Sequence, residues 1–167
     1  MVRYLGARKD QAGQVIEDTV AGELAQIMGD RTHLHATTVI ATGSGELEKT
    51  NKVKKIFHAA SVSGEIGQGY RPIENIGGCV TAALKKVDSP DFSDQGLKSI
   101  LFPLMGTGTG KGSLPDNAKK LLEAAISYLE ANPDSTIQRL YFLTWTDQEL
   151  ETCRSLLDKA DEAKPVP

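Results

Sequence analysis

The second half of the chain alternates short apolar runs with an amphipathic stripe. The runs KSILFPLM (Lys98–Met105) and IQRLYFLTW (Ile137–Trp145) read as strands, the first of them buried on both faces. The stripe between them, from Ala118 to Leu129, has helical spacing. Strand, helix and strand form the unit from which parallel sheets are built. This alternation predicts a layered α/β domain with helices on both faces of a largely parallel sheet.

The first half extends the same pattern. Residues 14–28 and 73–87 carry apolar side chains at helical spacing, which predicts two helices. Residues 37–41 and 53–60 are short and apolar or β-branched, so they predict strands, whereas residues 61–72 hold three glycines and a proline and predict a loop. Two further helices have clear start signals, in which a Ser or Thr precedes an acidic residue by three positions: Ser113 with Asp116, and Thr146 with Glu149.

Composition and charge set limits on function. The 167 residues are 40% hydrophobic and 25% charged, which suits one domain over residues 1–157 with a flexible tail at 158–167. A net charge of −3 argues against general nucleic-acid binding. No stretch approaches the roughly 20 apolar residues of a membrane span. Cys79 and Cys153 lie on apolar helical stripes, which predicts buried reduced thiols in a cytoplasmic protein.

The segment between the apolar run and the helix that follows it, GTGTGKG, is rich in glycine. Glycine permits positive φ and close backbone approach, so successive N–H groups can converge on an anion, and the helix dipole adds to the attraction. Threonine hydroxyls can donate hydrogen bonds, and the lysine adds a point charge. The alternative is a merely flexible connection. The pattern favours a phosphate-binding loop made of Gly106, Thr107, Gly108, Thr109, Gly110, Lys111 and Gly112.

Two common phosphate-binding motifs do not fit this loop. A Walker A loop needs glycine at position 105 and serine or threonine at position 112, where the chain has Met105 and Gly112. The dinucleotide fingerprint G-x-G-x-x-G fails because each placement puts Lys111 or Ser113 where its last glycine should stand. Neither motif therefore accounts for the glycines.

The histidines give little support to a metal site or to catalysis. His33 and His35 are spaced like a metal-binding pair, but no cysteine or third histidine lies near them in the sequence, so a solvated turn is favoured. His58 falls within a predicted strand and is expected to have a structural role. No catalytic residue is assigned.

The run KSILFPLMGTGTGKGSLPDNAKKLLEAAISYLE, followed by IQRLYFLTWTDQELETC, resembles the second half of a macro domain. In that family, an apolar strand ending in proline leads to a Gly-Thr-Gly type loop around the diphosphate of ADP-ribose. A long helix, a last strand and a terminal helix follow. The run TTVIATGSGELEKTNKVKKIFHAASVSG is similar to the family's middle portion. The resemblance implies a three-layer α/β/α macro-domain-like mixed sheet.

The resemblance also implies roles for single residues. The glycines and threonines from Gly106 to Gly110 would line the diphosphate and the distal ribose. Trp145 stands where the family often places an aromatic ring against the adenine. Two interpretations of Trp145 remain open at this point, namely adenine stacking and a core anchor whose N–H is satisfied by backbone. The resemblance implies ADP-ribose as ligand and no cofactor or metal.

The family's opening elements have no counterpart in this sequence. Macro domains open with a strand bearing an adenine-site Asp, then a strand ending in an Asn-rich loop, then a first glycine loop. Here the early glycines, Gly6 and Gly13, are isolated, so we expect the fold to be N-terminally truncated or rearranged. A sheet without a central strand exposes unpaired edges, which predicts re-pairing, swapping or a homodimer.

Three functions follow as hypotheses. The leading one is a module that binds ADP-ribose, a related nucleotide diphosphate or an ADP-ribosylated protein through the glycine-rich loop. The first alternative is an ADP-ribosyl hydrolase, which would need residues that position a water. The second alternative is an interaction or oligomerisation domain that binds no nucleotide.

Overall fold

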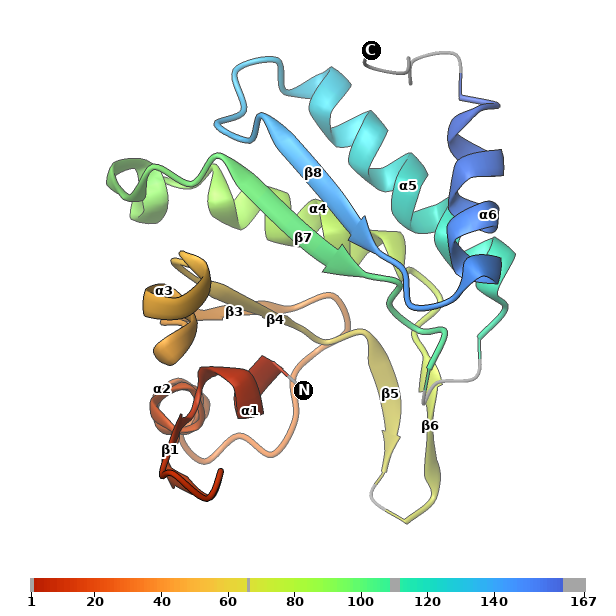
Figure 1. The fold of residues 1–167 in the computed structure, drawn as a ribbon. Helices are drawn as coiled ribbons and strands as arrows, with labels where there is room; N and C mark the ends of the chain where they lie inside the picture. The colour runs from red at the N-terminus through yellow and green to blue at the C-terminus, as the bar shows by residue number, and fades with distance from the viewer. Residues whose placement is uncertain (1, 66, 109–111, 161–167) are drawn as a thin grey trace.

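The computed structural model describes residues 2–65, 67–108 and 112–160, and it alternates helices with short strands (Figure 1). The helices are α1 (Val2–Gly6), α2 (Thr19–Met28), α3 (Glu46–Asn51), α4 (Gly77–Val87), α5 (Leu114–Ala131) and α6 (Asp147–Leu157), with a 3₁₀ helix η1 (Pro90–Gln95) after α4. The strands are β1 (Arg8–Lys9), β2 (Val15–Glu17), β3 (Val39–Thr42), β4 (Ile56–Ala59), β5 (Val62–Glu65), β6 (Gly69–Pro72), β7 (Ser99–Pro103) and β8 (Arg139–Leu143).

The described strands pair in twos, and three of the four pairs are antiparallel: β1–β2, β3–β4 and β5–β6. The pair β7–β8 is parallel, in a register that runs from Ser99↔Arg139 to Pro103↔Leu143. The expectation of a largely parallel sheet is therefore wrong. The reason lies in the connections between paired strands. Among the described pairs, only β7 and β8 have a long helix, α5, between them, and a parallel pair requires such a crossover.

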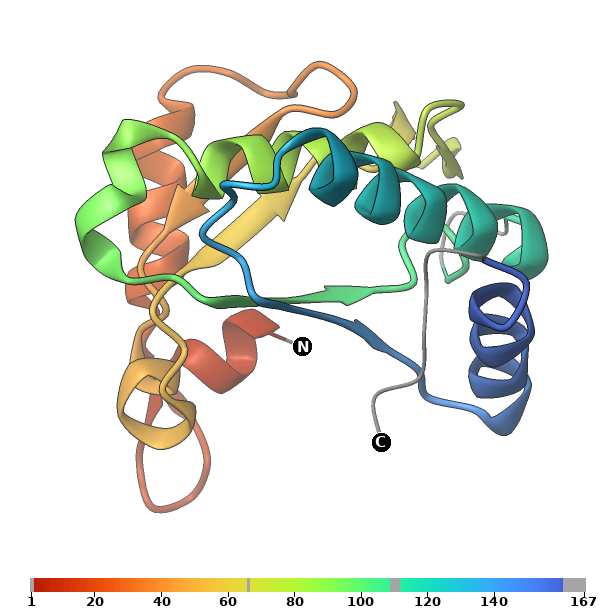
Figure 2. The same ribbon diagram turned by 90° about the horizontal axis from the view of Figure 1, so that it is seen from above.

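The architecture is three-layer α/β/α, as the sequence predicts. Figure 2 shows α4 and α5 side by side on one side of the strands and α1 on the other. On the β3–β4 pair, α4 contacts both strands, and α2 contacts β3. The most deeply buried part of the core comes from the facing stripes of α4 and α5, namely Ile76 just before α4 and then Cys79, Val80, Ala83, Leu84, Ala118 and Leu121.

The β7–β8 pair has one buried and one open face. Phe102 and Phe142 stack at 5.8 Å between ring centres on the side that packs against the helices. The side chains that alternate with them point away, and Leu101 and Tyr141 remain 57% and 49% exposed. The prediction that β7 is buried on both faces is wrong, because Phe102 packs into the core on one face while Leu101 on the other face is exposed.

Two segments differ from the predicted elements because short-range pairing overrides the apolar pattern. Residues 14–28 do not form one helix: Val15–Glu17 pairs with β1, and α2 begins only after Asp18, whose carboxylate accepts from the Ala21 N–H at 2.8 Å. Residues 61–72 form the hairpin β5–β6 instead of a loop. The helix α3 lies between two predicted strands and was not predicted.

Both predicted helix starts are confirmed. The Ser113 hydroxyl accepts from the Asp116 N–H at 3.4 Å, at the start of α5. At α6, the Glu149 N–H donates to the Thr146 hydroxyl at 3.2 Å, and the Thr146 N–H donates to the Glu149 carboxylate at 3.1 Å. This reciprocal pair is a capping box, and it fixes where the chain turns after β8.

Asp88, directly after α4, ties three elements together. One carboxylate oxygen accepts from the Tyr128 hydroxyl of α5 at 2.9 Å. The other accepts from the Thr136 N–H at 2.9 Å and the Thr136 hydroxyl at 3.0 Å, just before β8. Burial alone would raise the pKa of Asp88, but these bonds and one from Ser135 outweigh it, so the pKa lies below its ordinary value.

Both cysteines are free and buried, as predicted. Burial raises the pKa of the Cys79 thiol to about 11, because a desolvated thiolate is disfavoured. The Cys79 thiol is therefore even less ionised at neutral pH than an exposed thiol. None of the described helices has the length and apolar character needed to cross a membrane.

Candidate functional site

The glycine-rich loop connects the end of β7 to the start of α5. Because β7 and β8 are parallel, Pro103 and Leu143 lie side by side at the same edge of the sheet. The loop after β7 and Trp145 after β8 both leave from this edge. Ligands of α/β domains bind at the carboxyl ends of the strands. The tertiary structure therefore brings together the two parts of the predicted site that are far apart in sequence.

The base of the loop is closed by a backbone hydrogen bond. The Gly112 N–H donates to the Gly106 carbonyl at 2.9 Å, so the two ends of the loop meet. Gly106 has φ = 82°, a backbone conformation that residues with a side chain rarely adopt. The predicted residues Thr109, Gly110 and Lys111 lie outside the described part of the chain.

Thr107 and Gly108 have different roles from each other. The Thr107 hydroxyl donates to the Leu104 carbonyl at 2.7 Å, so its proton stabilises the turn. The expectation that this hydroxyl donates to a ligand stays a prediction. Gly108 is exposed, and a Cβ placed on it would meet no atom of the described residues within 4 Å. Gly108 consequently offers open backbone at the outer part of the loop.

Asn117 is a buried polar residue beside the ends of the loop, and the sequence did not single it out. It lies in the first turns of α5, is 7% exposed, and its Nδ2 has no hydrogen-bond partner among the described residues. A signal was present, because Asn117 stands four residues before Leu121 on the apolar stripe of the helix. A polar residue on such a stripe needs a partner or a function.

Trp145 is an exposed ring at the carboxyl edge of the sheet. Its side chain is 65% exposed, and its backbone N–H donates to the Glu149 carboxylate at 2.6 Å. The capping box of α6 thus holds the backbone on which the indole is mounted. Of the two interpretations left open by the sequence, the core anchor is wrong, because a core anchor would be buried.

The charge near the start of α5 is mixed. The helix N-terminus favours an anion, but Asp116 in its first turn places a negative charge beside it. Attraction to phosphate at this end therefore depends on backbone N–H groups and uncharged donors more than on net charge.

The histidines form no site. His33 and His35 contact each other edge to face at 6.4 Å, and the described residues contain no cluster that suits a metal ion. His58 lies in β4 and shares a hydrogen bond of 2.9 Å with the Thr42 hydroxyl. This partner agrees with the structural role predicted for it.

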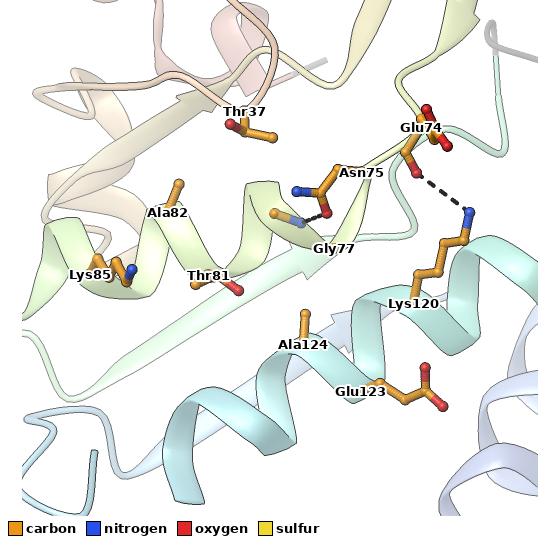
Figure 3. Close-up of a pocket in the computed structure, with 11 residues that line it drawn as sticks. Thr37, Glu74, Asn75, Gly77, Thr81, Ala82, Lys85, Lys120, Glu123 and Ala124 are labelled. Carbon is orange, nitrogen blue, oxygen red and sulfur yellow. Dashed lines mark hydrogen bonds between the residues drawn. The ribbon is translucent and has the colours of Figure 1, made fainter. Parts of the chain in front are cut away.

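A separate hollow of about 780 Å³ lies on the helical layer, between α4 and α5 (Figure 3). Thr37 lies above it, and the Lys120 ammonium reaches the Glu74 carbonyl at 3.4 Å along its side. None of the described residues of the glycine-rich loop lines it. Its lining mixes small side chains with lysines and glutamates.

The comparisons with known proteins agree on the family. The sequence model of the macro domain family matches residues 8–121. This chain therefore belongs to the macro domain family. A search of curated proteins found no match.

Several solved macrodomains have a similar fold. A mutant macrodomain of Oceanobacillus iheyensis with ADPR has a TM-score of 0.62 and 18% identity, with 84% of this chain and 68% of that chain covered. The Trypanosoma brucei macrodomain in complex with ADP has a TM-score of 0.65 and 17% identity, with 93% of this chain and 59% of that chain covered. The Oceanobacillus iheyensis macrodomain with ADP has a TM-score of 0.64 and 18% identity, with 95% of this chain and 79% of that chain covered. At these identities the likeness establishes the fold.

Proposed function

We propose that this macro domain binds ADP-ribose, or a related nucleotide diphosphate, either free or attached to a protein. The diphosphate would lie against the loop from Gly106 to Gly112, and the adenine against Trp145. One observation carries the proposal: the loop and the exposed indole leave the same carboxyl edge of the parallel pair β7–β8. The macrodomains of similar fold that were solved with ADP or ADPR support it.

The physical basis differs at the two ends of the ligand. Backbone N–H groups of a glycine loop and a helix N-terminus stabilise phosphate oxygens. An exposed indole offers a flat apolar face, and stacking of a base on such a face contributes about 1–3 kcal/mol. Because these interactions involve different residues, each end can be tested alone.

Trp145→Ala is expected to weaken ADP-ribose binding by about 5- to 150-fold, the equivalent of the stacking energy. The melting temperature should hardly change, because the ring is exposed. Isothermal calorimetry with ADP-ribose measures the affinity of the natural chain and of the variant. Tyr141→Ala, which removes an exposed aromatic of β8, is the matched control and should bind normally. A folded natural chain that gives no heat with ADP-ribose would contradict the proposed function itself.

We infer further that two copies associate through the β7–β8 pair. Among the described strands, β7 has β8 as its single neighbour, and the outer face carries exposed Leu101 and Tyr141. Unpaired edges and apolar faces favour pairing with a second copy. Light scattering should give twice the 18.0 kDa mass of the monomer. Leu101→Lys should shift the protein to the monomer, whereas Gly22→Lys in α2, which is not part of this pair, should not. A monomer at every concentration would refute this inference.

Two further points belong to the proposal. We take residues 1–157 as one domain and residues 158–167 as its tail. The two free, buried thiols support a reducing, cytoplasmic location.

A further inference from the structure

The side-chain amide of Asn117 is the one buried side-chain donor without a hydrogen bond in the described part of the chain. Its residue is 7% exposed, and it lies near the N-terminus of α5, a helix of 18 residues. Buried amide groups in native proteins are almost always paired, because desolvation without a partner is unfavourable. An unpaired donor at this place therefore calls for a functional explanation.

The surroundings of Nδ2 identify where a partner would lie. A Cβ on Gly106 would fall 2.7 Å from this atom, and a Cβ on Gly112 would fall 2.3 Å from it. Nδ2 therefore lies at the base of the glycine-rich loop, where the loop's two ends meet. The same positions are flanked by carbon atoms of Pro72 and Ile76, which cannot accept a hydrogen bond.

The two glycines keep this place free of side chains. Any residue with a Cβ at position 106 or 112 would collide with the amide. The Gly106 carbonyl, the nearest acceptor of the loop base, already receives the Gly112 N–H at 2.9 Å. The donor thus lies against the two ends of the loop, and no described group of the protein uses it.

We propose that Asn117 is a ligand-binding residue whose amide donates to a phosphoryl oxygen of the bound diphosphate. This inference rests on the proposed function and adds a residue to it. An uncharged donor suits this place, because Asp116 already puts a carboxylate on the first turn and a second acceptor would repel the anion.

The test compares Asn117→Leu with the natural chain. Leucine has a similar size and lacks the donor, so the free variant should melt at a higher temperature. Its affinity for ADP-ribose should fall by about tenfold or more, since hydrogen bonds to charged groups are the strong ones. Asn117→Asp keeps the shape of the side chain but replaces the amide donor with a carboxylate acceptor. This variant should bind ADP-ribose more weakly still. In the natural chain, ADP-ribose should move the side-chain amide signal of Asn117 in a ¹H–¹⁵N spectrum.

The outcomes separate the two proposals. If the natural chain binds ADP-ribose and Asn117→Leu binds it equally well, the role of Asn117 is refuted while the proposed function stands. If the variant melts lower and the amide signal does not move with ligand, Asn117 has a purely structural role. If the folded natural chain does not bind ADP-ribose, the proposed function fails, and this inference fails with it.

Discussion

Gly108→Glu is expected to reduce ADP-ribose binding by at least about 100-fold while leaving the fold intact. The added carboxylate would stand in the loop where the diphosphate is proposed to lie. Two like charges about 4 Å apart repel by roughly 4 kcal/mol at the effective dielectric constant of a protein surface. The fold should tolerate the change, because Gly108 is exposed and a Cβ on it would lie more than 4 Å from every atom in the described part of the chain.

The measurement is calorimetric titration with ADP-ribose, accompanied by circular dichroism and thermal unfolding. Gly22→Glu is the matched control: Gly22 is also exposed and free of neighbours, but it lies in α2. It adds the same charge to the protein and should leave affinity unchanged. Gly108→Ala adds a methyl group without a charge, so it separates the effect of side-chain size from the effect of charge on affinity. Normal binding by a folded Gly108→Glu variant would show that the ligand does not contact this part of the loop.

Asp88→Ala should lower the free energy of unfolding by about 3 kcal/mol. The change removes the acceptor of the Tyr128 hydroxyl and of two Thr136 donors. A buried donor left without a partner costs about 1–3 kcal/mol, and Tyr128 is 6% exposed. Urea unfolding at neutral pH measures the difference. Tyr128→Phe removes one of these bonds and should cost less; equal stability of Asp88→Ala and the natural chain would contradict the account.

The same carboxylate predicts how stability depends on pH. The pKa of Asp88 is lowered in the folded protein, so its contribution is complete above the ordinary value of about 3.9 and is lost as the pH falls further. Burial, and then Asp88, raise the pKa of Tyr128 to about 12, so stability should also fall as the pH rises from about 10 to about 12. Asp88→Ala should flatten the acid side of the unfolding profile.

The sequence predicts the elements of the second half well because their signals are local. The helix α5 begins at Leu114, after the predicted cap Ser113, and α6 begins after the predicted capping box at Thr146. A cap depends on residues within three positions of each other, so the pattern is sufficient. The glycine-rich loop is predicted for the same reason, since φ freedom is a property of each glycine.

The errors concern contacts between elements, some of them neighbours in the sequence and some of them distant. Val15–Glu17 looks helical by apolar spacing, yet it pairs with β1 across the turn at Gly13, which has φ = 79°. Periodicity likewise does not show which face of β7 is covered, because the covering elements lie far away in sequence.

The sequence by itself determined the helix starts, the glycine loop and the likeness to macro domains, because each rests on neighbouring residues. Only the tertiary structure decided that Trp145 is exposed at the same sheet edge as the loop. It also decided that Asn117 lies beneath the two ends of that loop without a partner. Exposure and unpaired donors are properties of packing, since they depend on which atoms from the rest of the chain come near.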